Sequence, residues 1–105
     1  MNIFDYDTGL NKNTISKIQN CFAKFKEIDK VLLYGSRAKG NYRIGSDIDL
    51  CIVGQNTNTN TVLKVENLLD DLMLPYSFDI SVYHLIDNPS FVEHIDRVGI
   101  TFYER

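Results

Sequence analysis

Two short apolar segments around a glycine-rich turn restrict most strongly what this chain can fold into. Val31-Leu32-Leu33-Tyr34 ends at Gly35, and a second apolar segment, from Asp47 to Val53, ends at Gly54. Short apolar runs bounded by glycine are typical of buried strands. Residues 35–46, which join the two segments, contain three glycines and three basic residues. We predict that they form a turn followed by a short helix.

Helices and strands are predicted to alternate along the rest of the chain. Apolar residues recur at three- and four-residue intervals in two stretches, which indicates amphipathic helices. The Asn/Thr-rich run 55–61 is expected to be a polar loop that caps the second of them. Strict alternation from Tyr76 to Tyr83 predicts a half-buried strand. The predicted elements are helices at 11–27, 62–72 and 88–98 and strands at 31–34, 47–53, 76–83 and 99–103.

The size and charge of the chain limit its function. The 105 residues are 44% hydrophobic and 24% charged, as in a soluble globular protein. We therefore expect one domain over residues 1–105, of the α/β or α+β class. A net charge of −3 makes direct nucleic-acid binding unexpected. A template-directed polymerase would need further domains to hold a duplex.

The sequence also suggests where the protein acts. The N-terminus lacks the basic and apolar regions of a signal peptide, and no stretch approaches the roughly 20 apolar residues that span a bilayer. We therefore expect a cytoplasmic protein with no membrane association. Cys21 and Cys51 belong to no metal or redox motif, and buried free thiols are expected for both.

The glycine-rich turn is a candidate anion site. A turn between a strand and a helix presents backbone N–H groups to an anion, and we expect Ser36 at the cap of that helix. Gly35 and Gly40 match the start of a P-loop, but Asn41-Tyr42 replaces the Lys-Ser/Thr pair that would follow. A Walker A nucleotide site is therefore excluded.

Three aspartates indicate a metal-dependent reaction. Asp47 and Asp49 are two residues apart on a predicted strand, so their side chains leave the same face roughly 6–7 Å apart. Asp79 lies in the middle of another predicted strand, where an acid is disfavoured. Such carboxylates can hold one or two Mg²⁺ ions against substrate phosphates. The alternative is that the aspartates are solvated strand ends and that the glycines only shape turns.

The segment from Leu33 to Gly40, together with Gly45-Ser46-Asp47-Ile48-Asp49-Leu50, resembles the signature of the nucleotidyltransferase superfamily that includes DNA polymerase β. Within it, the chain is similar to the minimal nucleotidyltransferases (MNT), which pair with HEPN-domain proteins as toxin–antitoxin modules. The resemblance implies a palm-like mixed β-sheet backed by helices. It also implies that Asp47, Asp49 and Asp79 are the catalytic, metal-binding triad.

The resemblance and the chemistry together assign further roles. Asp47 and Asp49 would hold Mg²⁺ against the phosphates of ATP, and Asp79 would bind a second Mg²⁺ and help to deprotonate the acceptor hydroxyl. The residues expected to contact the nucleotide are Gly35, Ser36, Arg37, Lys39, Arg43 and Ser46. Arg37 is the favoured phosphate ligand because it lies nearest the turn, and the alternative for the basic residues is a solvated loop.

The leading hypothesis is a Mg²⁺-dependent protein adenylyltransferase that acts as an antitoxin. It would transfer AMP from ATP to a tyrosine of a cognate HEPN ribonuclease toxin and release pyrophosphate. A second hypothesis is an antitoxin that binds nucleotide without catalysis and neutralises its HEPN partner by complex formation. A third is nucleotidyl transfer to a small molecule, as in aminoglycoside-modifying enzymes, although these usually carry an extra helical domain.

Overall fold

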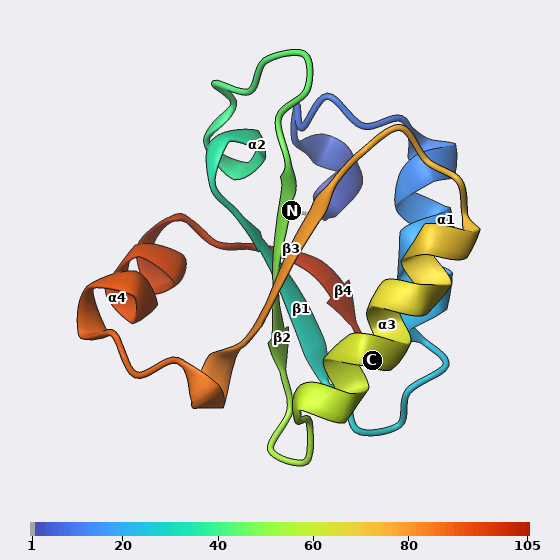
Figure 1. Cartoon of the computed structure of the whole chain (residues 1–105). Coiled ribbons are helices and arrows are strands. Elements are labelled where there is room, and N and C mark those ends of the chain that lie inside the picture. Colours follow the sequence, from blue (N-terminus) through green and yellow to red (C-terminus); the bar gives the residue numbers. More distant parts are fainter. Residues whose placement is uncertain (1) are drawn as a thin grey trace.

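Four strands form one mixed sheet, and helices lie on both of its faces (Figure 1). The computed structural model describes residues 2–105. In chain order the elements are the 3₁₀ helix η1 (Ile3–Asp5), α1 (Lys12–Phe22), β1 (Lys30–Tyr34), α2 (Ser36–Lys39), β2 (Ile48–Val53), α3 (Thr59–Asp71), β3 (Phe78–Val82), the 3₁₀ helix η2 (Tyr83–Leu85), α4 (Pro89–Val98) and β4 (Ile100–Glu104). This order confirms the predicted alternation and the mixed α/β class.

The strands lie in the order β3-β2-β1-β4. Strand β1 is antiparallel to both β2 and β4, whereas β2 and β3 are parallel. Antiparallel neighbours can be joined by a short connection, but parallel neighbours need a crossover. Helix α3 provides that crossover between β2 and β3.

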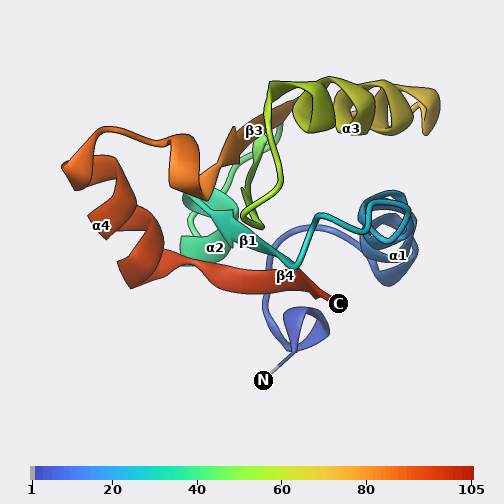
Figure 2. The same cartoon turned by 90° about the horizontal axis from the view of Figure 1, so that it is seen from below.

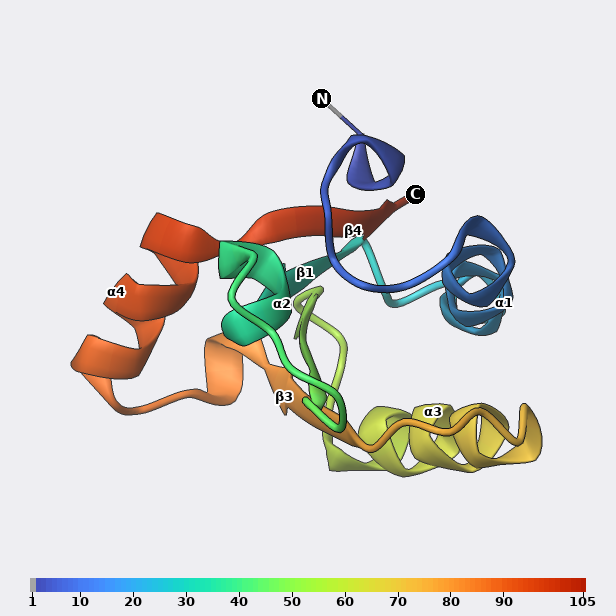
Figure 3. The same cartoon turned by 90° about the horizontal axis from the view of Figure 1, so that it is seen from above.

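Alternate residues of the strands face two different sets of helices. Helices α1 and α3 lie on one side of the sheet and α4 on the other, as Figures 2 and 3 show from below and above. On the first side Val31 and Leu33 join the main core, to which Phe22 and Leu69 also belong. On the second side Tyr34 and Cys51 pack with Ile95 of α4. The two faces therefore have separate apolar cores.

Helix α1 ends earlier than the sequence predicted, at Phe22 rather than at Glu27. The chain continues in tight turns, in which Phe25 N–H donates to the Phe22 carbonyl at 3.1 Å and Ile28 N–H to the Phe25 carbonyl at 3.2 Å. Phe25 still packs against the main core. Apolar spacing of three residues is shared by α-helices and such turns, so it did not mark the end of the helix.

Strand ends also differ from the prediction in one place that concerns the site. Strand β2 begins at Ile48, so Asp47 lies just outside the strand and not on it.

Cys21 and Cys51 are buried and free, as predicted. Within residues 2–105, no helix has both the length and the apolar character needed to cross a membrane.

The polar loop before α3 caps that helix, as its composition predicted. Asn58 Oδ1 accepts from Thr61 N–H at 3.1 Å, and Thr61 Oγ1 accepts from Asn58 N–H at 3.3 Å, which makes a reciprocal capping box.

Replacing Asn58 by alanine is expected to lower the free energy of unfolding by about 1 kcal/mol, the usual cost of losing an N-cap. Urea denaturation followed by circular dichroism measures it. Asn56→Ala, at an exposed position in the same loop, is the matched control and should leave stability unchanged. Equal effects of the two substitutions would contradict the capping role.

Candidate active site

The turn after β1 has a backbone conformation that requires glycine. Gly35 has φ 75° and ψ −156°, a backbone conformation that residues other than glycine scarcely adopt. A Cβ atom at this position would collide with Oδ2 of Asp49. The close approach of the turn to a carboxylate of β2 therefore depends on the missing side chain.

Helix α2 is short and begins at Ser36, with Gly35 as its N-cap residue. Ser36 was expected at the cap and instead occupies the first helical position, because only glycine fits the backbone of the preceding residue. The N–H groups of the first turn, which an α-helix leaves without intrahelical acceptors, belong to Ser36, Arg37 and Ala38. These donors lie directly after the turn that contacts Asp49.

Two of the predicted acids lie side by side on neighbouring strands. Asp49 of β2 pairs in register with Asp79 of β3 in the parallel ladder. Residues opposite each other on adjacent strands point to the same face of the sheet. Asp49 is half-buried and Asp79 is exposed. Asp47, also exposed, comes directly before β2. The three acids therefore lie at the N-terminal ends of β2 and β3.

The environment of Asp49 disfavours its negative charge. Burial, and then the neighbouring carboxylates of Asp79 and Asp47, raise the pKa of Asp49 to about 6, while the charge of Arg37 acts in the opposite direction. Carboxylates that share a site raise one another's pKa because their charges repel. The effect of both neighbours on Asp49 is evidence that the three acids form one electrostatic unit.

Two hydroxyl groups that the sequence did not single out, those of Tyr34 and Ser81, lie near the acids. Tyr34, the register partner of Asp49 on β1, is buried, and its hydroxyl lies 3.5 Å from Ser81 Oγ. Burial is the main reason why the pKa of Tyr34 is raised to about 12. Ser81 belongs to the same polar face of β3 as Asp79, and this alternation was its only signal in the sequence.

Arg37 occupies a position different from the one expected of a phosphate ligand. Its side chain is buried, with 3% relative exposure. Nε and Nη2 donate to the Ser46 carbonyl at 3.3 and 2.9 Å, and Nη1 donates to the Thr8 carbonyl at 2.9 Å. The guanidinium group therefore binds the protein's own backbone. A phosphate contact, which the sequence predicted for Arg37, would have to share this group with the backbone carbonyls.

The other predicted nucleotide contacts remain at the surface. Lys39 and Arg43 are exposed. Ser46 is half-buried, and its hydroxyl accepts a hydrogen bond from Arg43 N–H at 2.8 Å, so it shapes the loop before Asp47. Neither histidine of the chain belongs to this group: His84 is exposed, and His94 is half-buried and packs edge-on against Tyr34.

The acids suit a hard cation by their chemistry. Carboxylate oxygens are the ligands that Mg²⁺ prefers, and the ion is usually held by one or two carboxylates together with substrate phosphates. Among residues 2–105, no three side chains of His, Cys, Asp or Glu are grouped so that they could hold a metal ion. The carboxylates of Asp47, Asp49 and Asp79 are therefore the right type of donor for Mg²⁺, but a substrate phosphate would have to complete the coordination.

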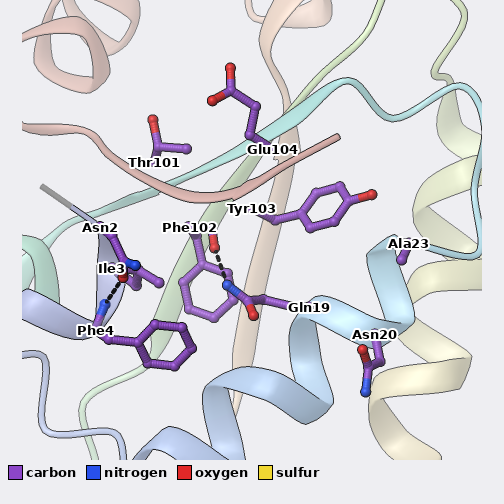
Figure 4. A pocket seen from close by; sticks show the side chains of 10 residues that line it. All are labelled: Asn2, Ile3, Phe4, Gln19, Asn20, Ala23, Thr101, Phe102, Tyr103 and Glu104. Atoms are coloured by element: carbon purple, nitrogen blue, oxygen red, sulfur yellow. Dashed lines mark hydrogen bonds between the residues drawn. The ribbon is translucent and has the colours of Figure 1, made fainter.

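Two cavities of the described chain are lined by residues other than Asp47, Asp49 and Asp79. A cavity of about 510 Å³ lies between η1, α1 and β4 and includes Phe4 and Tyr103 in its lining (Figure 4). There Gln19 Nε2 donates to the Phe102 carbonyl at 2.9 Å. A second, of about 320 Å³, is lined by Arg37 and residues of the loop after α2. The candidate site is therefore defined by the acids and the glycine turn, and not by a cavity.

The sequence model of the family described as "Polymerase beta, Nucleotidyltransferase" matches residues 16–105. No match was found among curated protein sequences. The match includes the glycine turn, both strands with aspartates and all four strands of the sheet.

Several solved structures with the same fold come from toxin–antitoxin complexes. A chain of a toxin–antitoxin complex with AMP-PNP has a TM-score of 0.68 and 17% identity, over 91% of this chain and 75% of that one. A chain of the MntA–HepT toxin–antitoxin has a TM-score of 0.65 and 14% identity, over 90% and 74%. A chain from the complex of tri-AMPylated Shewanella oneidensis HEPN toxin with MNT antitoxin has a TM-score of 0.61 and 15% identity, over 93% and 73%. At these identities the likeness is one of fold.

Proposed function

Because the chain belongs to the polymerase β nucleotidyltransferase family, we propose that it is a Mg²⁺-dependent nucleotidyltransferase whose site lies at Asp49 and Asp79. The observation that carries this proposal is the in-register pairing of these acids beside the Gly35 turn. One strand pair thus presents carboxylates next to unpaired helix N–H groups, a combination suited to a metal–triphosphate substrate. Residues 1–105 would form a single catalytic domain.

The residues of the site divide the work between metal and nucleotide. Asp47, Asp49 and Asp79 would hold Mg²⁺, which, when bound, neutralises phosphate charge and favours in-line attack at the α-phosphorus. Gly35 and Ser36 would place backbone N–H groups against the triphosphate. Lys39 and Arg43 are exposed and cationic, so they would contact the phosphates from the edge of the site. Ser46 would support them by its hydrogen bond from Arg43 N–H.

The acids also bear on the acceptor. Asp79 is exposed, so its carboxylate can reach a hydroxyl group that arrives from solvent or from a partner protein. Accepting the proton of that hydroxyl during attack would be its second role. Because the pKa of Asp49 is raised to about 6, a bound cation would favour the charged form of this carboxylate.

We infer that the acceptor is a tyrosine of a HEPN toxin and that the transferred group is AMP. The support is the shared fold with chains of toxin–antitoxin complexes, of which one contains AMP-PNP and another an AMPylated HEPN toxin. The chain would then be an MNT antitoxin that silences its partner by modification.

Incubation of the protein with its HEPN partner, Mg²⁺ and ATP labelled at the α-phosphate tests this function. We expect label on the toxin, on a tyrosine located by mass spectrometry, and none with Asp47→Asn combined with Asp49→Asn. Asp70→Asn combined with Asp71→Asn, two exposed acids at the end of α3, is the matched control and should transfer normally.

Three results would count against the adenylyltransferase. Label that survives the active-site double substitution would remove the acids from the reaction. Protection of cells by that double variant would favour neutralisation by binding alone. Label on an aminoglycoside, with none on the toxin, would favour small-molecule transfer.

A further inference from the structure

Asp47 lies outside the strand that carries the other acid of its motif. Because β2 begins at Ile48, the sheet ladder does not itself hold Asp47. On its C-terminal side, Ile48 N–H donates to the Ser77 carbonyl at 2.9 Å. On its N-terminal side, the Ser46 carbonyl accepts two of the three hydrogen bonds that the Arg37 guanidinium group donates. These two anchors fix the peptide groups on either side of Asp47.

Aromatic rings hold the guanidinium group in place. The Cζ atom of Arg37 lies 5.4 Å from the centre of the Tyr42 ring and 5.0 Å from that of Tyr76. Both distances are within the range of cation–π attraction, which strengthens when the cation is desolvated. We call Arg37, Tyr42 and Tyr76 the arginine clamp.

The clamp also joins the N-terminal segment to the loop that precedes Asp47. Arg37 Nη1 donates to the carbonyl of Thr8, which is buried, and the Tyr42 hydroxyl donates to Asp7 Oδ1 at 2.7 Å. A Cβ atom at Gly9 would lie 2.5 Å from the Tyr42 ring, so the chain passes tightly over it. In Figure 1 this segment and the loop after α2 lie at the same end of the molecule.

We propose that Arg37 is a positioning residue, which fixes the Ser46–Asp47 peptide so that Asp47 meets the metal ion beside Asp49. This inference rests on the proposed metal site. It extends that site to residues 7–9, which precede the matched family range of 16–105. A planar guanidinium group can donate two hydrogen bonds to one carbonyl while stacking on rings, and a lysine ammonium cannot reproduce both. Substituting a residue that orients a metal ligand typically lowers metal affinity about 10- to 100-fold.

The test is Arg37→Lys, with Arg97→Lys as the matched control because Arg97 is exposed and paired only with Glu93 among the described ion pairs. Binding of Mn²⁺ to the protein alone is measured by electron paramagnetic resonance. R37K is expected to bind Mn²⁺ about 10- to 100-fold more weakly, and R97K like the wild type. At saturating Mn²⁺, R37K should bind a non-hydrolysable ATP analogue within about twofold of wild type, since excess metal restores the site.

Two outcomes would overturn the positioning role. One is unchanged Mn²⁺ affinity in R37K. The other is a loss of analogue affinity that persists at saturating Mn²⁺, which is the signature of a direct phosphate contact. If circular dichroism shows R37K unfolded, Tyr76→Leu replaces it, with a severalfold loss of Mn²⁺ affinity expected and an unchanged affinity counting against the clamp.

Failure of the metal site itself gives a different pattern. If the wild type binds no Mn²⁺, or if Asp49→Asn leaves Mn²⁺ binding unaltered, the proposed metal site is wrong and the clamp has no ligand to position. If Asp49→Asn removes binding and R37K does not weaken it, only the clamp is wrong.

Discussion

Replacing Gly35 by alanine is expected to reduce nucleotidyl transfer strongly and to destabilise the fold. The backbone of Gly35 has φ 75° and ψ −156°, a conformation that costs alanine on the order of 1–3 kcal/mol. The new Cβ atom would also collide with Asp49 Oδ2, so the turn or the carboxylate must move. A displacement of about 1 Å at a catalytic group can cost about 10²-fold in rate. We therefore expect transfer to fall by at least about that factor.

The matched control is Gly40→Ala. Gly40 also has a positive φ, 83°, but a Cβ atom there would meet no heavy atom within 4 Å. It should cost about 1 kcal/mol of stability and leave most of the transfer activity. Thermal unfolding and labelled-ATP assays of both variants measure the difference. Equal losses of activity would show that general strain, and not contact with Asp49, explains the effect.

Replacing Asp49 by asparagine is expected to lower transfer while raising thermal stability. The carboxylate is central among the acids, and loss of a metal ligand that supplies several kcal/mol of transition-state stabilisation reduces the rate by at least about 10²-fold. Without metal, the same carboxylate is repelled by Asp79 and Asp47 in a half-buried position. Asparagine removes that repulsion, so the melting temperature measured in EDTA should rise by a few degrees, roughly 4 °C.

The stability difference should depend on pH in a defined direction. In the folded protein the pKa of Asp49 is raised to about 6 from an ordinary value of 3.8. A carboxyl with a raised pKa stabilises the fold when protonated, and this contribution is lost as the pH rises from about 4 through 6. The advantage of D49N over wild type should therefore be greatest above pH 7 and vanish below pH 4. A constant difference across this range would contradict the assigned repulsion.

Much of the fold could be predicted from local patterns. The alternation of apolar and polar residues identified β3, and the Asn/Thr-rich run 55–61 predicted a capped helix after it, although α3 begins at Thr59 and not at the predicted residue 62. These features depend on neighbours in the chain, so they are visible in the sequence. The end of α1 was misplaced because the turns after Phe22 keep Phe25 in the core at helical spacing.

The candidate site could be predicted only in part. Asp49 and Asp79 were assigned to one site from the family signature, and the register of β2 and β3 agrees with that assignment. The environment of Arg37 was missed, since its hydrogen-bond acceptors and one of its rings come from Thr8, Ser46 and Tyr76. A basic residue beside a glycine turn looks the same in sequence whether it binds phosphate or backbone.

The sequence by itself determined the family to which the chain belongs, and it predicted the residues of the proposed site, a glycine after one apolar strand and aspartates at two others. Tertiary structure decided how they act together. The parallel pairing of β2 with β3 brings Asp79 beside Asp49, and burial, followed by repulsion from the neighbouring carboxylates, raises the pKa of Asp49. Burial of Arg37 between two tyrosines directs its hydrogen bonds to the backbone. Pairing and burial join residues distant in the chain, and no local pattern records them.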